Sequence, residues 1–480
     1  MSRARYLRCG LAAWTAVLAG CATHVPQALS PQLVPQSFVG QDAARDSVWP
    51  KPDWWQQFGS AELSEFIARA QADNRDLAVA AAGVVEAHAQ TIIQRASLFP
   101  QLNLQAQAER SKPSGPTGIG TYPSGNSFGL GLGASYEVDV WGLARSNLRA
   151  ATETLKAARF SQQAVALTVT ANVANAYFSV LALRKRIAIA NEDILAINDI
   201  LRTIQLRVTT GTSSHLDLAQ ERAQVESVEA QLPQLEEQEL EARVALAVLL
   251  GQAPESLEVK TPSLEAIHPP LVNPGLPSDL LLRRPDVALA EADLASAHAS
   301  LDAARAAFLP QFALNGSDGF ASAAIGTLLH GPSVAWDYGG SLLQTVFDGG
   351  KLVGQKKLAE GTQQQLIASY QRAVLNAYAD VETALGQVQH SDLAEQHLGR
   401  EVDAAREAFQ ISQLQYRQGT TDLLTVLQSQ QTLFSAEDQL AQITLARMQA
   451  VVHLYEALGG GWLEQSGERT QFTSPPVPTS

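Results

Sequence analysis

Two short segments of the chain alternate strictly between apolar and polar residues. Over residues 101–109 leucine and alanine alternate with asparagine, glutamine and glutamate, and over 128–138 large apolar residues alternate with glycine, serine and glutamate. A period of two places each kind of side chain on its own face of a β-strand. The two segments enclose a Gly/Pro/Ser-rich stretch at 111–126. They therefore predict a hairpin of two strands of about ten residues, a length that can span a membrane.

A weaker copy of this pattern lies in the second half of the chain. Phe312 and Leu314 precede a loop, and Trp336, Tyr338 and Gly340 follow it. The copy predicts a second hairpin. For both hairpins, an ordinary soluble hairpin with one face on a core is the alternative.

Long helices are predicted on either side of these hairpins. No proline lies between Pro123 and Pro233 or between Pro332 and Pro475, and proline inside a helix costs about 3 kcal/mol. Apolar residues recur at helical spacing through 350–417, which predicts one helix of roughly 100 Å. The chain then turns at Gly419, as it does at Gly211 in the first half. Each half is therefore predicted to form a strand hairpin, a long helix, a tight tip and a long returning helix.

The two halves also share short sequences in the same order. Ser97-Leu98-Phe99-Pro100-Gln101 is echoed by Ala307-Phe308-Leu309-Pro310-Gln311, and Asn175-Ala176-Tyr177 by Asn376-Ala377-Tyr378. The offset stays near 200–210, which indicates one structural unit used twice.

Four strands are too few to close a membrane barrel. Membrane barrels have at least about eight strands, and an open sheet edge cannot face lipid. If the hairpins lie in a membrane, the chain must therefore associate with copies of itself. Three copies give twelve strands, although symmetry alone also allows two.

The N-terminus has the features of a lipoprotein leader. Arg3, Arg5 and Arg8 precede an apolar run, and Leu18-Ala19-Gly20-Cys21 places small residues before a cysteine. This stretch resembles a bacterial lipoprotein signal, which implies lipidation of Cys21 and insertion of its acyl chains in outer-membrane lipid. Ordinary signal cleavage beside an incidental cysteine is the alternative. The predicted division is a signal peptide at 1–20, a lipidated linker at 21–58, a first repeat at 59–251, a Pro-rich connection at 252–284, a second repeat at 285–462 and a disordered tail at 463–480.

Composition excludes several classes of function. The formal net charge is −14 and basic clusters are missing, so nucleic-acid binding is not expected. The sequence contains no metalloprotease, serine-hydrolase or phosphate-loop motif. We therefore expect no enzyme activity, no metal site and no cofactor.

Longer motifs carry a resemblance to a known family. They are Trp54-Trp55-Gln56-Gln57-Phe58, the stretch from Gly275 to Val287 with Arg283-Arg284-Pro285-Asp286, and Leu454-Tyr455-Glu456-Ala457-Leu458-Gly459-Gly460-Gly461-Trp462. With these motifs the chain resembles the TolC-like outer-membrane factor family, specifically its NodT-type efflux lipoproteins. The resemblance implies a homotrimer with a twelve-stranded β-barrel, four strands per chain, that continues into a long periplasmic α-helical barrel. It also implies a passive channel that joins a periplasmic adaptor and an inner-membrane resistance-nodulation-division (RND) transporter.

The resemblance also points to residues at the helix tips. Acidic residues ring the aperture in this family, which here suggests Asp217 and Asp422 as gate residues. Family members often carry aspartate at the positions of Thr425 and Gln428, so the acidic ring is shifted or weaker in this chain. The residues that resemble the adaptor-docking pattern are Arg207, Gly211, Thr212, Arg417, Gly419 and Thr420. Helix capping is the alternative for both sets.

Two other functions remain as alternatives. A lipid-anchored periplasmic adaptor also combines helical hairpins with β segments, but it has one helical hairpin, whereas the duplication predicts two. An anchored cell-wall enzyme is the other alternative, although no acid/base pair suggests it. The exported substrate cannot be inferred, so drug, metal and aromatic-acid export all stay open.

Overall fold

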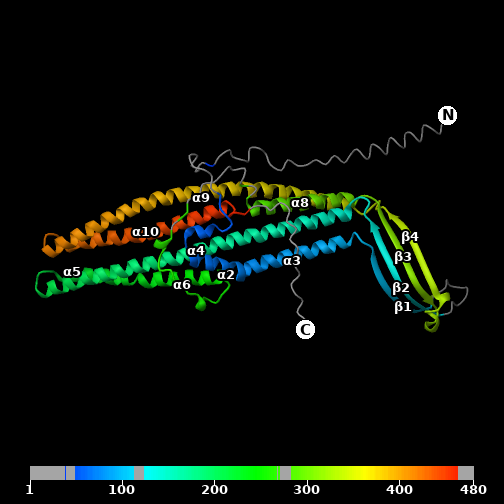
Figure 1. The fold of residues 1–480 in the computed structure, drawn as a ribbon, viewed down its shortest axis with the longest axis horizontal. Coiled ribbons are helices and arrows are strands. Elements are labelled where there is room, and N and C mark those ends of the chain that lie inside the picture. Colours follow the sequence, from blue (N-terminus) through cyan, green and yellow to red (C-terminus); the bar gives the residue numbers. More distant parts are fainter. Residues whose placement is uncertain are drawn as a thin grey trace, which may run out of the picture.

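The computed structural model describes residues 38, 49–112, 124–267, 269–270, 280 and 283–462. In it a β-sheet lies at one end of a long bundle of helices (Figure 1). The first half forms α2 (Ala61–Asp73), α3 (Arg75–Ala96), β1 (Gln101–Ser111), β2 (Gly125–Val138), α4 (Leu143–Thr209), α5 (His215–Glu229) and α6 (Leu232–Leu249). The second half forms α8 (Pro285–Ala306), β3 (Gln311–Ser322), β4 (Val334–Leu343), α9 (Lys351–Gln418) and α10 (Leu423–Ala457). The leader, Cys21 and the tail at 463–480 lie outside the described residues.

The four strands form one antiparallel sheet in the order β1-β2-β3-β4. Both predicted hairpins are confirmed, and the pairing of β2 with β3 joins the two halves of the chain. Leu104 pairs with Leu132, so the apolar residues of neighbouring strands share one face. The opposite face carries polar side chains on β1 and glycines on β2. β1 and β4 are edge strands, and the outer edge of each is unpaired within the described chain.

Close strand contact explains one of the glycines in this sheet. A Cβ atom built on Gly319 of β3 would lie 2.4 Å from the Cα of Gly131 on β2. Real Cβ atoms do not approach a backbone this closely, so β2 and β3 can only meet here because both residues are glycine.

The predicted long helices are confirmed. α9 covers Lys351–Gln418, close to the predicted 350–417, and α4 has a similar length of 67 residues. At about 1.5 Å per residue both helices are about 100 Å long. α4 also contains an 18-residue window that is apolar enough to cross a membrane, but half of that window is buried inside the protein. Its hydrophobic residues therefore contribute to the chain's own core.

The prediction of a continuous returning helix is wrong for the first half. α5 ends at Glu229 and α6 begins at Leu232, whereas the equivalent α10 runs unbroken for 35 residues. Pro233 lies in the first turn of α6. Proline lacks an N–H group and its ring clashes with the carbonyl four residues earlier, so a helix breaks before it and restarts around it.

The largest core lies midway along the bundle and joins both chain halves. A short 3₁₀ helix, η2 (Trp54–Phe58), inserts two buried aromatic rings there. Trp54 stacks on Tyr455 of α10 with ring centroids 4.8 Å apart, and Phe58 contacts Phe178 of α4 at 5.2 Å. The N-terminal and C-terminal sequence motifs therefore form one packing unit.

The Arg-Arg-Pro-Asp motif also has a packing role. Arg284 is buried and donates hydrogen bonds to Asp286, to Asp380 of α9 and to the carbonyl of Ala457 in α10. Gly459 has a φ of 84°, and a Cβ there would lie 1.7 Å from the Arg283 carbonyl oxygen. Only glycine allows this approach, so the two sequence motifs contribute to one packing contact.

Candidate functional site

The candidate site lies at the end of the bundle farthest from the sheet, where both helical hairpins turn (Figure 1). α4 ends before Gly211 and α9 before Gly419, and both glycines have a φ of 75°. The N–H of Thr212 bonds the carbonyl of Arg207 at 2.8 Å, and the N–H of Thr420 bonds the carbonyl of Gln415 at 2.9 Å. These are the bonds of a glycine-centred helix C-cap. The two tips therefore have the same backbone geometry.

Both aspartates at the tips take part in helix capping: Asp422 is the N-cap residue of α10, and Asp217 forms a capping box with Ser214, the N-cap residue of α5. The Asp217 carboxylate accepts from the Ser214 N–H at 2.9 Å and from the Ser213 hydroxyl at 2.8 Å. Asp422 accepts from the Thr425 N–H at 2.9 Å and from its hydroxyl at 2.6 Å. These bonds lower the pKa of Asp217, mainly through the Ser214 N–H, and that of Asp422, mainly through the Thr425 hydroxyl. Both carboxylates are therefore ionised at neutral pH.

On α10 the three candidate gate residues lie along one side. Asp422, Thr425 and Gln428 follow each other at intervals of three residues and all three are exposed. Thr425 is tied to Asp422, whereas the backbone carbonyl of Gln428 accepts from Thr432. Asp217 lies on the other hairpin, on α5.

Arg207 links the two tips directly. Its guanidinium donates to the carbonyls of Tyr416 at 2.9 Å and Arg417 at 3.2 Å, and it lies 4.4 Å from the centre of the Tyr416 ring. These carbonyls end α9, so Arg207 caps a helix of the neighbouring hairpin rather than its own. The Arg417 side chain makes no ion pair or hydrogen bond with another residue in the part of the chain that the structure describes.

Further polar contacts join the hairpins above the tips. Gln224 of α5 bonds Gln431 of α10 at 3.0 Å, and Arg186 of α4 pairs with Asp438 of α10 at 2.6 Å. These contacts were not predicted, because the partners lie about 200 or more residues apart. The internal repeat nevertheless carries a signal for two contacts between the hairpins. The partners in Arg207–Tyr416 and Gln224–Gln431 are separated by nearly the offset of the repeat.

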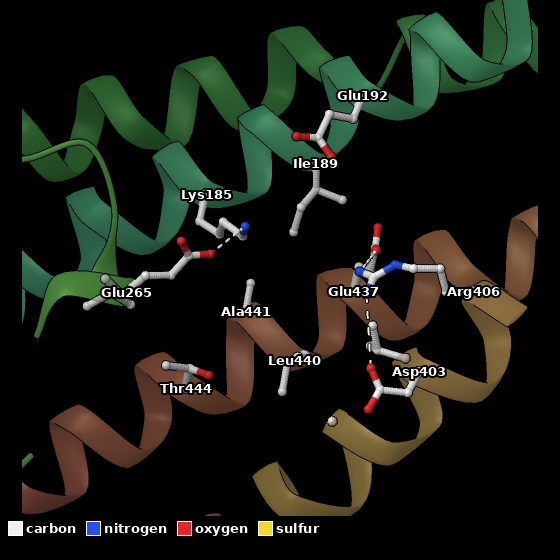
Figure 2. Close-up of a pocket in the computed structure, with 13 residues that line it drawn as sticks. Lys185, Ile189, Glu192, Glu265, Asp403, Arg406, Glu437, Leu440, Ala441 and Thr444 are labelled. Carbon is white, nitrogen blue, oxygen red and sulfur yellow. Dashed lines mark hydrogen bonds and ion pairs between the residues drawn. The ribbon is translucent and has the colours of Figure 1, made fainter. Parts of the chain in front are cut away.

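A groove of about 440 Å³ opens between the hairpins farther from the tips. Figure 2 shows α4 on one side of it and α9 and α10 on the other. Lys185 pairs with Glu265 at 2.6 Å, and Arg406 pairs with Glu437 at 2.7 Å. These ion pairs neutralise Glu265 and Glu437, two of the acidic groups that line the groove. Among the described residues, no three His, Cys, Asp or Glu side chains lie close enough to hold a metal ion.

At the opposite end, the edges of the sheet are incomplete. Leu102 and Leu104 on β1 and Trp336 and Tyr338 on β4 are all more than two-thirds exposed. Unpaired edges with apolar residues are stable in a membrane only when further strands close the sheet into a barrel. In a membrane, the four-stranded sheet of one chain therefore needs the strands of further copies of the chain to close it.

Comparison with known proteins identifies the family. The family described as outer membrane efflux protein matches residues 66–252 and 276–460. The pyoverdine export outer membrane protein OpmQ of Pseudomonas putida is 36% identical, over 94% of this chain and 97% of its own. The probable outer membrane lipoprotein SilC of Salmonella typhimurium is 29% identical, over 93% and 97%.

Solved structures agree in fold. The outer-membrane channel OprN superposes with a TM-score of 0.85 at 28% identity, covering 90% of this chain and 98% of its own. The open state of the MtrE outer membrane channel of Neisseria gonorrhoeae gives 0.81 at 29%, covering 89% and 96%. A periplasmic adaptor, one of the two alternatives that the sequence left open, is therefore excluded.

Channels of this family are homotrimers, so three copies of the four-stranded sheet close a twelve-stranded barrel and the helices continue it as a periplasmic tube. This arrangement supplies the missing partners of β1 and β4. The chain belongs to the outer membrane efflux protein family, and it is an outer-membrane channel subunit with a large periplasmic part.

Proposed function

We propose that this subunit works as a passive conduit without any catalytic step, and that the helix tips are both its gate and its docking end. Members of this family form the outer-membrane part of tripartite pumps, together with a periplasmic adaptor and an inner-membrane RND transporter, and this chain is such a part. The observation that carries the proposal is the pair of matching glycine-centred tips, which expose short polar turns at the periplasmic end. The tip acids are committed to helix caps, which supports a structural and electrostatic role.

Asp217, Asp422, Thr425 and Gln428 are the proposed gate residues. Three-fold symmetry repeats each carboxylate three times around the axis, and a ring of negative charge attracts cations. The double variant Asp217→Asn, Asp422→Asn tests this role, because asparagine also caps helices and the fold should survive. Reversal potentials in a KCl gradient across planar bilayers should show reduced cation preference. Asp199→Asn, an exposed site on α4 away from the tip, is the control; equal selectivity in both variants would contradict the gate.

Arg207, Gly211, Thr212, Arg417, Gly419 and Thr420 are the proposed docking residues. Arg417 is the sharpest test among them, because its side chain contributes no bond to the described fold. Arg417→Ala should weaken capture of the adaptor by the purified trimer, while Arg202→Ala, on the exposed side of α4, should not. Unchanged capture by Arg417→Ala would remove this residue from the docking surface.

A lipid anchor at Cys21 is proposed with the division of the chain given above. The relative SilC is a probable outer membrane lipoprotein, which supports the proposal. Mass spectrometry of the mature N-terminus should find an acylated Cys21, and Cys21→Ser should abolish acylation. An unmodified N-terminus at another residue would refute it.

For the cargo, we propose a water-soluble secreted metabolite similar to pyoverdine. Two pyoverdine export proteins are 36% and 37% identical to this chain, whereas the toluene channels TtgC and TtgI are 30% and 32% identical. The polar face of β1, with Asn103, Gln105 and Gln107, suits a polar cargo in the barrel. Deleting the gene should lower the secreted metabolite in culture supernatant without altering toluene tolerance. Sensitivity to toluene alone would favour solvent export instead.

A further inference from the structure

One acidic side chain is buried inside the helical hairpins without a hydrogen-bond partner. Glu221 lies on α5, six residues after the first residue of that helix and thus about 9 Å along it from the tip. It is fully buried, with 0% of its surface exposed, and neither carboxylate oxygen has a hydrogen-bond partner among the described residues. Buried carboxylates are ordinarily paired or hydrogen-bonded, because burying an unpaired charge is costly.

Through Asp193 of α4, Glu221 is connected to a side chain of α10. Asp193 of α4 lies close enough to repel its charge. Asp193 accepts a hydrogen bond from the Gln430 amide of α10 at 2.8 Å, and the carbonyl oxygen of Gln430 is itself buried without a partner. The charge of Glu437 on α10 also raises the pKa of Asp193. Glu437 itself forms an ion pair with Arg406 of α9 at 2.7 Å (Figure 2). We call Glu221, Asp193 and Gln430 the Glu221 cluster.

The Glu221 cluster has more acceptor oxygens than donor groups, since its one donor, the Gln430 amide, bonds Asp193. When Glu221 is ionised, both of its carboxylate oxygens can only accept hydrogen bonds. The carbonyl oxygen of Gln430 is also only an acceptor. A proton on Glu221 converts one of these acceptors into a donor and removes the buried charge. In agreement, burial and the charge of Asp193 raise the pKa of Glu221 to about 7, and burial also raises the pKa of Asp193.

The cluster sits where the two hairpins of one chain meet. Asp193 and Glu221 belong to the first hairpin, and Gln430 belongs to the second. Gln224, one turn along α5 from Glu221, bonds Gln431 of α10. Separation of the hairpins at this level would break the Gln224–Gln431 and Asp193–Gln430 hydrogen bonds.

We propose that Glu221 is a proton-binding site that stabilises the contact between the two hairpins of each protomer, and that it releases its proton when the hairpins separate. The proposal rests on the tips acting as the gate. The buried, hairpin-contacting state favours the neutral acid, and the hydrated, separated state favours the carboxylate. By linkage, acidic pH stabilises the closed tips, and a rise in pH toward 7 favours opening.

Conductance of the full-length trimer in planar bilayers tests this coupling between pH 5.5 and 8.5. The open probability of the wild-type channel should rise with pH, by up to tenfold per pH unit for each coupled proton. Glu221→Gln keeps the shape and a neutral side chain, so it should stay closed with little pH dependence. Glu226→Gln, an exposed carboxylate on the same helix, is the matched control and should follow the wild type. A wild-type pH profile in Glu221→Gln would overturn the proposal.

An infrared measurement separates proton binding from gating. The purified wild-type trimer should show a protonated carboxyl band at pH 6 that disappears by pH 8, and this change should be missing in Glu221→Gln but present in Glu226→Gln. Identical spectra for wild type and Glu221→Gln would overturn the proton-binding site. The band together with pH-independent conductance would instead overturn the coupling to the hairpins and would point to failure of the proposed gate.

Discussion

Removing Arg207 should loosen the contact between the helix tips. Its guanidinium makes two hydrogen bonds to carbonyls at the end of α9 and lies over the ring of Tyr416. The charge-assisted bonds at this partly exposed site contribute about 1.5 kcal/mol, the low end for hydrogen bonds to a charged group. The cation–π contact adds about 0.5 kcal/mol. Arg207→Ala should therefore shift the balance between closed and separated tips by about 2 kcal/mol per protomer, roughly thirtyfold.

Single-channel recording in planar bilayers measures this shift as open probability or as conductance of the resting state. Arg207→Lys should lie between wild type and alanine, since lysine keeps the charge but loses the planar fork that reaches two carbonyls. Arg202→Ala provides the control, because Arg202 lies on the same helix but pairs only with Asp199 at 3.1 Å on the exposed surface. If Arg207→Ala remains as closed as Arg202→Ala while still forming trimers, the tip contact does not contribute to closure and the reasoning is refuted.

Three further outcomes follow from packing and titration. Gly319→Ala should prevent heat-stable trimers on gels, because its Cβ would meet Gly131, while Gly339→Ala should not, because nothing lies within 4 Å of its Cβ; equal trimer yields would contradict the close strand contact. Trp54→Ala should cost about 3–5 kcal/mol and lower the melting temperature, since a ring that is 1% exposed is deleted; an unchanged melting temperature would contradict its core role. Folding raises the pKa of Glu221 from 4.5 to about 7, so the protonated acid contributes its full stability below pH 4.5. About 3 kcal/mol of this stability per chain is lost as pH rises to 7. Melting curves of Glu221→Gln should lack this pH-dependent loss, and parallel curves for wild type and variant would refute the shift.

The sequence predicts the regular elements well because their signals are local. The period of two in β1 and β2 fixes which residues share a face, and the observed pairing of Leu104 with Leu132 follows from it. The end of α9 at Gly419 likewise agrees with the left-handed conformation that glycine adopts at a helix C-terminus. Helix capping by Asp217 and Asp422 could also be predicted, because a short polar residue at the start of a helix is a local signal.

Contacts between the hairpins could be predicted only in part. Asp193 and Gln430 are 237 residues apart, and no period in the sequence relates them. Glu221 itself appears as one acid among many on a polar helix, and only the structure shows that it is fully buried. The break before α6 was not predicted, although Pro233, in the first turn of α6, is a local signal for it.

The two kinds of acid near the tips should therefore differ in their response to pH near neutrality. Asp217 and Asp422 are fixed by donors at helix N-termini, which lower their pKa values and keep them ionised throughout the neutral range. Any acidic ring that they form has a constant charge there and cannot report a change from pH 6 to pH 8. Glu221 has no donor, is buried beside Asp193, and titrates within this interval. The pH sensitivity of the channel near neutrality should therefore come from titration of Glu221, between the hairpins. Asp217 and Asp422 at the aperture should not contribute to it.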